Sequence, residues 1–107
     1  MKQIVQNELK LLVDIIVRVV PVEKIFLFGS FATGKEHNDS DLDIFVVLKE
    51  NADIREIDAM KLINKAIRDK KTMPVDIIVC KRINFNQKKH VPSIERQIAQ
   101  EGMVIYG

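Results

Sequence analysis

Cysteine is nearly absent from this chain, and so are the features that mark several other classes of protein. Cys80 is the only cysteine, which excludes an internal disulfide and a zinc site built from several cysteines. Because Cys80 ends an apolar run that begins at Val75, we expect it to be a small buried side chain. No apolar run approaches the roughly 20 residues that a transmembrane helix needs, and the polar N-terminus does not resemble a signal peptide. We therefore expect a soluble, cytoplasmic protein.

The sequence also lacks an excess of charge of either sign. Its 17 Lys and Arg residues are scattered among 15 Asp and Glu residues, which gives a formal net charge of +2. Proteins that grip long nucleic acids usually concentrate basic residues on one face, so this balance argues against such a ligand. With 107 residues, of which 47% are hydrophobic, the chain is expected to form a single globular domain over residues 1–107.

Hydrophobic periodicity predicts helices alternating with strands. Helices are expected at residues 4–20, at about 53–70 after a capping box formed by Asp53 and Glu56, and at 93–100. Strands are expected at residues 24–28, 42–48 and 75–80, with a further short strand at 103–106. Residues 81–90 are interpreted as a polar connection. This order indicates a small α/β sheet covered by helices, and it leaves open whether the sheet is parallel or mixed.

Two aspartates at the start of the second expected strand are the most informative feature of the sequence. Side chains alternate along a strand, so Asp41 and Asp43 point to the same face, about 6–7 Å apart. Two carboxylates at that distance repel by roughly 2–3 kcal/mol at an effective dielectric constant near 20. A divalent cation would turn this repulsion into attraction, because converging carboxylates are what Mg²⁺ coordinates. Alternatively, both aspartates lie at a solvated strand end beside a turn.

Two more features strengthen the case for a metal and phosphate site. Asp76 stands in the third expected strand, where it could bring another carboxylate to the same end of the sheet. Gly29 and Ser30 follow the first strand, and a helical turn starting there would offer free N–H groups and a hydroxyl to a phosphate. Each feature alone also fits a strand-start acid or an ordinary turn.

The same glycine turn imitates a phosphate-binding P-loop. Gly29, Gly34 and Lys35 fit the pattern G-x-x-x-x-G-K, but Glu36 stands where a P-loop needs Ser or Thr to hold magnesium. We interpret this match as accidental, with Lys35 a solvated loop residue.

The spacing of Gly29-Ser30, ten residues, then Asp41-Leu42-Asp43 resembles the signature of the DNA polymerase β-like nucleotidyltransferase superfamily. In that family a third acid stands on a following strand, in the position of Asp76. The short length, leading helix and final residues resemble the minimal nucleotidyltransferases, which pair as antitoxins with HEPN-domain toxins. One departure is Thr33, where many relatives carry a basic residue. The resemblance implies a small mixed sheet of three to four strands flanked by helices, similar to the palm of polymerase β.

The resemblance also implies an activity. It would be the transfer of AMP from ATP, or another NMP from an NTP, to a hydroxyl acceptor, with two Mg²⁺ ions held by Asp41, Asp43 and Asp76. Gly29 and Ser30 would bind the nucleotide. The acceptor would be a tyrosine of a partner HEPN toxin in a type VII-like toxin–antitoxin pair, and a homodimer or hetero-oligomer is compatible with this.

Two other functions remain open at this point. The chain could be a regulatory subunit that binds nucleotide weakly or not at all and masks a partner by contact. Clustered acids also occur in metal-dependent nucleases, which would not need the Gly-Ser turn.

Overall fold

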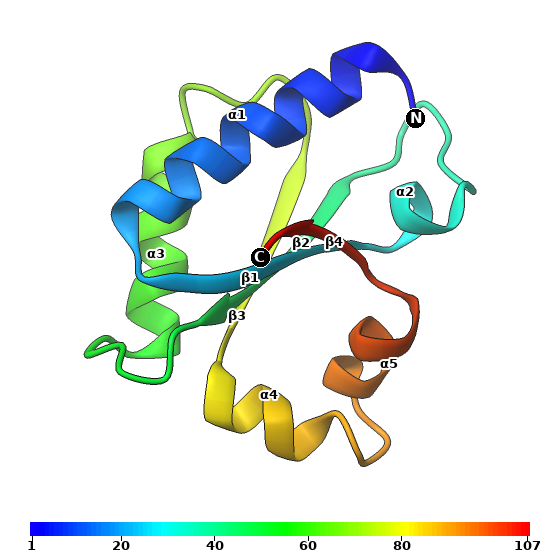
Figure 1. Ribbon diagram of the computed structural model, residues 1–107. Helices are drawn as coiled ribbons and strands as arrows, with labels where there is room; N and C mark the ends of the chain where they lie inside the picture. Colours follow the sequence, from blue (N-terminus) through cyan, green and yellow to red (C-terminus); the bar gives the residue numbers. More distant parts are fainter.

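The computed structural model describes residues 1–107, and the chain folds into one four-stranded sheet with helices on both faces (Figure 1). The strands are β1 (Val22–Phe28), β2 (Leu42–Leu48), β3 (Val75–Lys81) and β4 (Met103–Tyr106). The helices are α1 (Gln3–Val19), α2 (Ser30–Thr33), α3 (Glu56–Ile67), α4 (Arg82–Lys88) and α5 (Ile94–Glu101).

The sheet is mixed, with the strand order β3-β2-β1-β4. β1 pairs antiparallel with both β2 and β4, whereas β2 and β3 are parallel. The helix α3 makes the crossover between the two parallel strands, as a parallel connection requires. These features confirm the expected fold class. The strand pattern left open whether the sheet is parallel or mixed, and the pairing shows that it is mixed.

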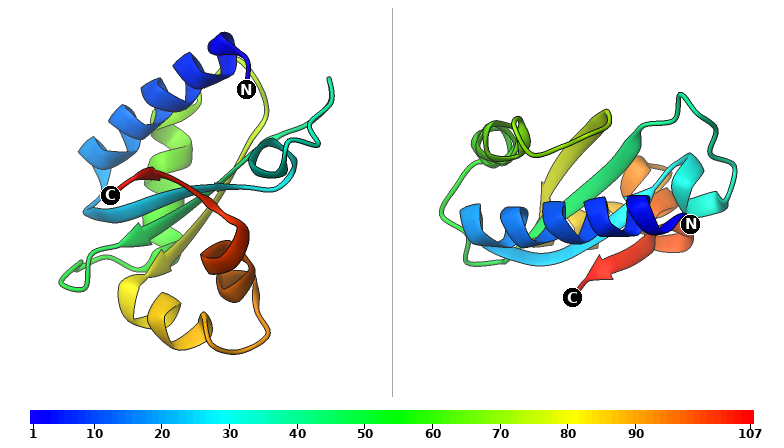
Figure 2. Two further views of the ribbon diagram at one scale, coloured as in Figure 1. Left: turned by 45° about the vertical axis from the view of Figure 1, so that its right-hand side comes forward. Right: turned by 90° about the horizontal axis from the view of Figure 1, so that it is seen from above.

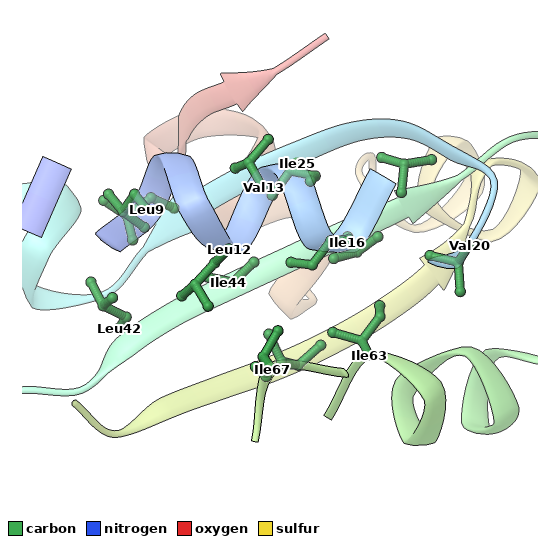
Figure 3. Close-up of a cluster of buried hydrophobic side chains, with 14 of the residues drawn as sticks. Leu9, Leu12, Val13, Ile16, Val20, Ile25, Leu42, Ile44, Ile63 and Ile67 are labelled. Carbon is green, nitrogen blue, oxygen red and sulfur yellow. The ribbon is translucent and has the colours of Figure 1, made fainter. Parts of the chain in front are cut away.

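The larger hydrophobic core lies between the sheet and the pair α1 and α3 (Figure 3). On α1, buried residues recur at helical spacing, at Leu9, Leu12, Val13 and Ile16, so one face of the helix covers β1 and β2. Ile63 and Ile67 of α3 close the same core beside β3 (Figure 3).

A smaller core covers the opposite face of the sheet, under α4 and α5 (Figure 2). Its centre is aromatic: the ring of Phe85 lies 5.7 Å from that of Phe26 and 5.8 Å from that of Phe45. Cys80 is buried in this cluster, which confirms the expectation of a buried apolar role. Burial is the main reason that the pKa of the Cys80 thiol rises to about 12, with the nearby Glu56 carboxylate adding to it.

Two local predictions were wrong. Residues 82–88, interpreted as part of a polar connection, form the helix α4, which a single buried aromatic residue, Phe85, anchors to the sheet. The helix α3 begins at Glu56, and the residue before it, Arg55, makes no side-chain cap, so Asp53 does not form a capping box. Instead the Glu56 carboxylate accepts hydrogen bonds from Lys81 N (2.7 Å) and Asn84 Nδ2 (3.3 Å), which tie α3 to the end of β3.

None of the helices combines the length and the apolar character needed to cross a membrane.

Candidate active site

The strand register brings two of the three acidic residues side by side. Asp43 is the second residue of β2 and Asp76 is the second residue of β3, and their Cα atoms are direct partners in the parallel pairing. On its other side Asp43 pairs with Phe28, the last residue of β1. Asp41 comes just before β2. The C-terminal end of β1 therefore meets the N-terminal ends of β2 and β3. Asp41, Asp43 and Asp76 all lie at these strand ends, which we call the acidic edge.

The alternation of side chains places Asp43 and Asp76 on the same face of the sheet. Leu42, Ile44 and Ile77 belong to the larger core under α1 and α3. Asp43 and Asp76 are next to these residues in their strands, so they point to the opposite face, which α4 and α5 cover. There they lie beyond the end of the smaller aromatic core. Asp43 is half-buried and Asp76 is exposed.

The position of Asp41 is fixed by the residues on both sides of it. Ser40 is buried, its N–H donates to the His37 carbonyl (3.0 Å), and its hydroxyl accepts a hydrogen bond from His37 N (2.9 Å). Leu42 N donates to the Pro74 carbonyl (3.0 Å). The sequence indicated a turn here, but it gave no sign that Ser40 would be buried within it.

The turn after β1 has the geometry that the sequence suggested. Gly29 has φ 75° and ψ −155°, a conformation that is open almost only to glycine, and it precedes the single-turn helix α2. The N–H groups of Ala32 and Thr33 both donate to the Gly29 carbonyl, at 3.1 and 3.2 Å. The N–H groups of Ser30 and Phe31, at the start of α2, have no acceptor within the helix, as is general for the first turn.

This turn and the acidic edge are in direct contact. A Cβ atom at residue 29 would clash with Oδ2 of Asp43 and lie 3.1 Å from its Cγ. The carboxylate therefore fills the space that only glycine leaves empty. The sequence pattern suggested that Gly29 and Asp43 belong to one site, but it could not show that the position of one residue depends on the other.

Asp43 lies in an unfavourable electrostatic environment. The pKa of Asp43 is raised, mainly because burial disfavours its charged form, and then because the carboxylates of Asp76 and Asp41 repel it. Throughout residues 1–107, no side chain forms an ion pair or a hydrogen bond with any of these three carboxylates. A bound cation would relieve this repulsion, and Mg²⁺ prefers carboxylate oxygens as ligands, so the chemistry of the donor set fits a divalent metal.

The side-chain positions do not yet form a complete metal centre. No group of three or more His, Cys, Asp or Glu side chains in residues 1–107 is arranged so that it could hold one ion. Asp43 and Asp76 are neighbours in the sheet. Metal coordination needs more than this, because the carboxylate oxygens must converge on one point. The backbone register holds Asp43 and Asp76 side by side, and rotation of their side chains changes only where the oxygens point.

Thr33 and Lys35 do not point to a P-loop. The Thr33 hydroxyl lies 3.3 Å from each of the carbonyl oxygens of Gly29 and Ser30, so it supports the turn. Gly34 ends α2 in a left-handed conformation, and Lys35 after it is exposed. This agrees with the interpretation of the G-K pair as accidental.

A cavity of about 210 Å³ adjoins the turn, and no sequence pattern indicated it. It is lined by Phe28, Gly29, Thr33, Gln97, Glu101 and Gly102. Residues of α5 thus face the turn after β1, although the two segments are far apart in the sequence. Helix packing alone creates this neighbourhood, so Gln97 and Glu101 could not be assigned to a site from local patterns.

Comparison with known proteins identifies the family. Residues 9–105 match the nucleotidyltransferase domain family, and no protein with a curated description matches the chain. Among solved structures, a Sulfolobus solfataricus protein assigned as a nucleotidyltransferase is 24% identical, with a TM-score of 0.65 over 94% of this chain and 78% of that one.

Two further structures are toxin–antitoxin complexes, and each match covers 94% of this chain and 73% of the other. One complex contains AMP-PNP and matches at 23% identity with a TM-score of 0.56. The other, MntA–HpeT with two aspartates replaced by glutamate, matches at 21% identity with a TM-score of 0.63. At these identities the structures show a shared fold, and the family match extends over nearly the whole sequence. The chain belongs to the nucleotidyltransferase domain family.

Proposed function

We propose that this protein transfers AMP from ATP, or more generally an NMP from an NTP, to a hydroxyl group with release of pyrophosphate. The observation that carries the proposal is the contact between the glycine turn and the acidic edge. The Asp43 carboxylate fills the space next to Gly29 and stands in register with Asp76. A phosphate chain on the turn would therefore lie beside the carboxylates.

In this proposal Asp41, Asp43 and Asp76 hold two Mg²⁺ ions. When bound, such ions stabilise both the attacking and the leaving oxygen of an in-line displacement. The pKa of Asp43 is raised, first by burial and then by its acidic neighbours. None of the three carboxylates has an ion-pair partner in the chain, which supports the assignment of a bound cation.

The remaining groups bind and orient the substrates. Gly29 N–H and the backbone or hydroxyl group of Ser30 would hold the β- and γ-phosphates and so fix the α-phosphorus for attack. The acceptor oxygen forms a bond to the α-phosphorus as the bond from that phosphorus to the bridging oxygen breaks. Pyrophosphate leaves, and Asp76 accepts the proton of the attacking hydroxyl.

We further propose that the acceptor is a tyrosine of a HEPN-domain toxin and that the chain acts as the antitoxin in the cytoplasm. The fold similarity to the two toxin–antitoxin complexes supports this proposal. In one complex the substituted aspartates stand two positions apart, the spacing of Asp41 and Asp43.

A transfer assay with α-labelled ATP, Mg²⁺ and the co-expressed partner tests the proposal. Replacing both Asp41 and Asp43 by Asn should abolish label transfer, and Ser30→Ala should reduce it less because the backbone donors remain. Asp39→Asn, in the exposed turn nearby, is the matched control. An unchanged rate in the double variant would reject the site.

A second candidate function is a regulatory subunit that masks its partner without catalysis. It is favoured by the absence of a ready-made three-ligand metal arrangement among residues 1–107. Calorimetric titration of ATP with and without Mg²⁺ separates the two functions. Binding that needs the metal supports the enzyme, whereas absent or metal-independent binding supports the regulatory subunit.

A further inference from the structure

The strand β4 exposes apolar side chains at the edge of the sheet. It pairs only with β1, so its outer side has no neighbouring strand (Figure 2). Met103, Val104 and Tyr106 are 44%, 49% and 40% exposed. Proteins commonly protect such edges with lysine or proline, and β4 contains neither. Met103 pairs with Leu27 of the larger core and faces the α1 side of the sheet, whereas Val104 pairs with Phe26 of the smaller core and faces the other side. Exposed apolar side chains at an uncovered edge are typical of a contact surface.

An apolar groove continues this surface between β4 and α1. It has a volume of about 430 Å³, and its apolar lining comes from Met1, Leu9, Val13, Met103 and Ile105. The groove lies on the α1 side of the sheet, whereas Asp43 and Asp76 point to the side covered by α4 and α5. It is therefore separate from the candidate active site.

Lys10 and Asp14 give the groove a charge pattern that is complementary to itself. Both residues line the groove from α1, are exposed, and stand one helical turn apart. They form no ion pair with each other or with any other residue. A lysine that precedes an acid by four residues is also the less favourable order for a pair within one helix. Both charges are thus available to another chain.

We propose that this face binds a second copy of the chain around a two-fold axis. Such an axis makes the two α1 helices antiparallel, and each contact between two positions then occurs twice. An axis midway between Lys10 and Asp14 would pass near Leu9 and Val13, which line the same groove. Lys10 of each protomer then faces Asp14 of its partner, and the apolar edges of both copies cover each other's grooves.

Side chains rather than a continuous sheet make this contact. The register between β1 and β4 shifts between Ile25 and Phe26, which leaves Ile105 as an extra residue on β4. A bulge disrupts the row of backbone groups that another strand would need. Apolar burial supplies the association energy, and the paired charges set the orientation, since exposed ion pairs contribute little energy themselves.

Sedimentation equilibrium of the full chain tests the proposal through charge exchange. We expect the wild type to be a dimer, and Lys10→Glu or Asp14→Lys to weaken dimerisation by about tenfold or more because each creates two like-charge pairs. The double variant carrying both substitutions should recover it, and mixing the two single variants should give a heterodimer. Lys61→Glu, exposed on α3 and outside the groove, is the control for net charge.

Met103→Lys, which places a charge in the apolar lining of the groove, should abolish the dimer in every one of these backgrounds. A monomeric wild type, or single charge reversals that leave the dimer intact, would overturn the proposal. Binding of a different protein at this surface, without any self-association, would also overturn the proposal. Circular dichroism of each variant ensures that the loss of a dimer is not a loss of folding.

Discussion

The Asp43 carboxylate occupies the space directly beside Gly29, where any other residue would place its Cβ atom. This contact joins the turn after β1 to the first residues of β2. It also makes Gly29 necessary for two separate reasons: its backbone conformation, with φ 75°, and the room it leaves for the acid.

Gly29→Ala tests that double requirement. The backbone strain should cost about 1–3 kcal/mol of unfolding free energy, and the displaced Asp43 should in addition abolish nucleotide transfer. Gly34→Ala is the matched control, because Gly34 has a similar φ of 73° but no atom within 4 Å of the position of its missing Cβ. It should cost about 1–2 kcal/mol and leave transfer intact. Chemical denaturation measures the loss of stability, and the transfer assay measures the loss of activity. A Gly29→Ala variant that remains active would contradict the contact between Gly29 and Asp43.

Asp43→Asn should separate stability from activity. Burial, then repulsion by Asp76 and Asp41, raises the pKa of Asp43 above its ordinary value of 3.8. A carboxyl group with a raised folded-state pKa supports stability while protonated, and that contribution is lost as the pH rises through the raised pKa. At neutral pH the variant should therefore unfold at a higher temperature than the wild type, and the difference should shrink in acid.

The same variant should lose nucleotide transfer by about a hundredfold or more, a loss typical for removing a group that stabilises developing charge. Mg²⁺ should raise the melting temperature of the wild type more than that of the variant, because a ligand stabilises only the state that binds it. Equal melting temperatures at neutral pH would show that the acids are not strained.

Glu56→Gln should change the acid stability of the fold. Burial acts to raise the pKa of Glu56, but hydrogen bonds from Lys81 N–H and Asn84 outweigh it, and the pKa falls below its ordinary value of 4.5. The stabilisation is then present above that value and is lost as the pH falls through the lowered pKa. Unfolding free energy measured between neutral pH and about pH 3 should decline less steeply in the variant. Parallel declines would rule out this role for Glu56.

Glu8→Ala should loosen the attachment of α1 to the segment before β3. The buried Glu8 carboxylate accepts hydrogen bonds from Thr72 N (3.0 Å) and Thr72 Oγ1 (2.8 Å). Loss of these hydrogen bonds should cost about 1 kcal/mol of unfolding free energy, because Thr72 is exposed and water can replace the acceptor. Glu8→Gln keeps one acceptor oxygen and should cost less. If both variants match the wild type in urea denaturation, the contact has no energetic role.

Sequence patterns predicted the parts of the fold that depend on local chemistry. β2 has the predicted bounds, because β-branched and aromatic residues run without interruption from Leu42 to Leu48. The alternation rule that was used to place Asp41 and Asp43 on one face also accounts for the position of Asp43 on the face opposite Leu42 and Ile44. In contrast, Val19 and Ile57 fit helical stripes but are 38% and 44% exposed, since periodicity gives no measure of where a core ends.

Contacts between distant segments could not be predicted in this way. The pairing of Glu8 with Thr72 and the reach of Glu56 to Lys81 depend on how α1 and α3 pack, and a local pattern contains no such information. The helix α4 escaped detection because one aromatic residue, Phe85, holds it in place. The acidic site was predicted from the pattern of Asp41, Asp43 and Asp76 and then from the resemblance to a family, whereas its direct contact with Gly29 required the structure.

The most direct test of the proposed site is a titration of the labelled protein with Mn²⁺, a paramagnetic ion that accepts the same oxygen ligands as Mg²⁺, followed by NMR. We expect backbone amide signals to broaden first around Asp41, Asp43, Asp76 and Gly29, and this broadening to disappear when Asp41 and Asp43 are both replaced by Asn. Broadening centred elsewhere, or unchanged in the double variant, would contradict a divalent-metal site at this edge of the sheet.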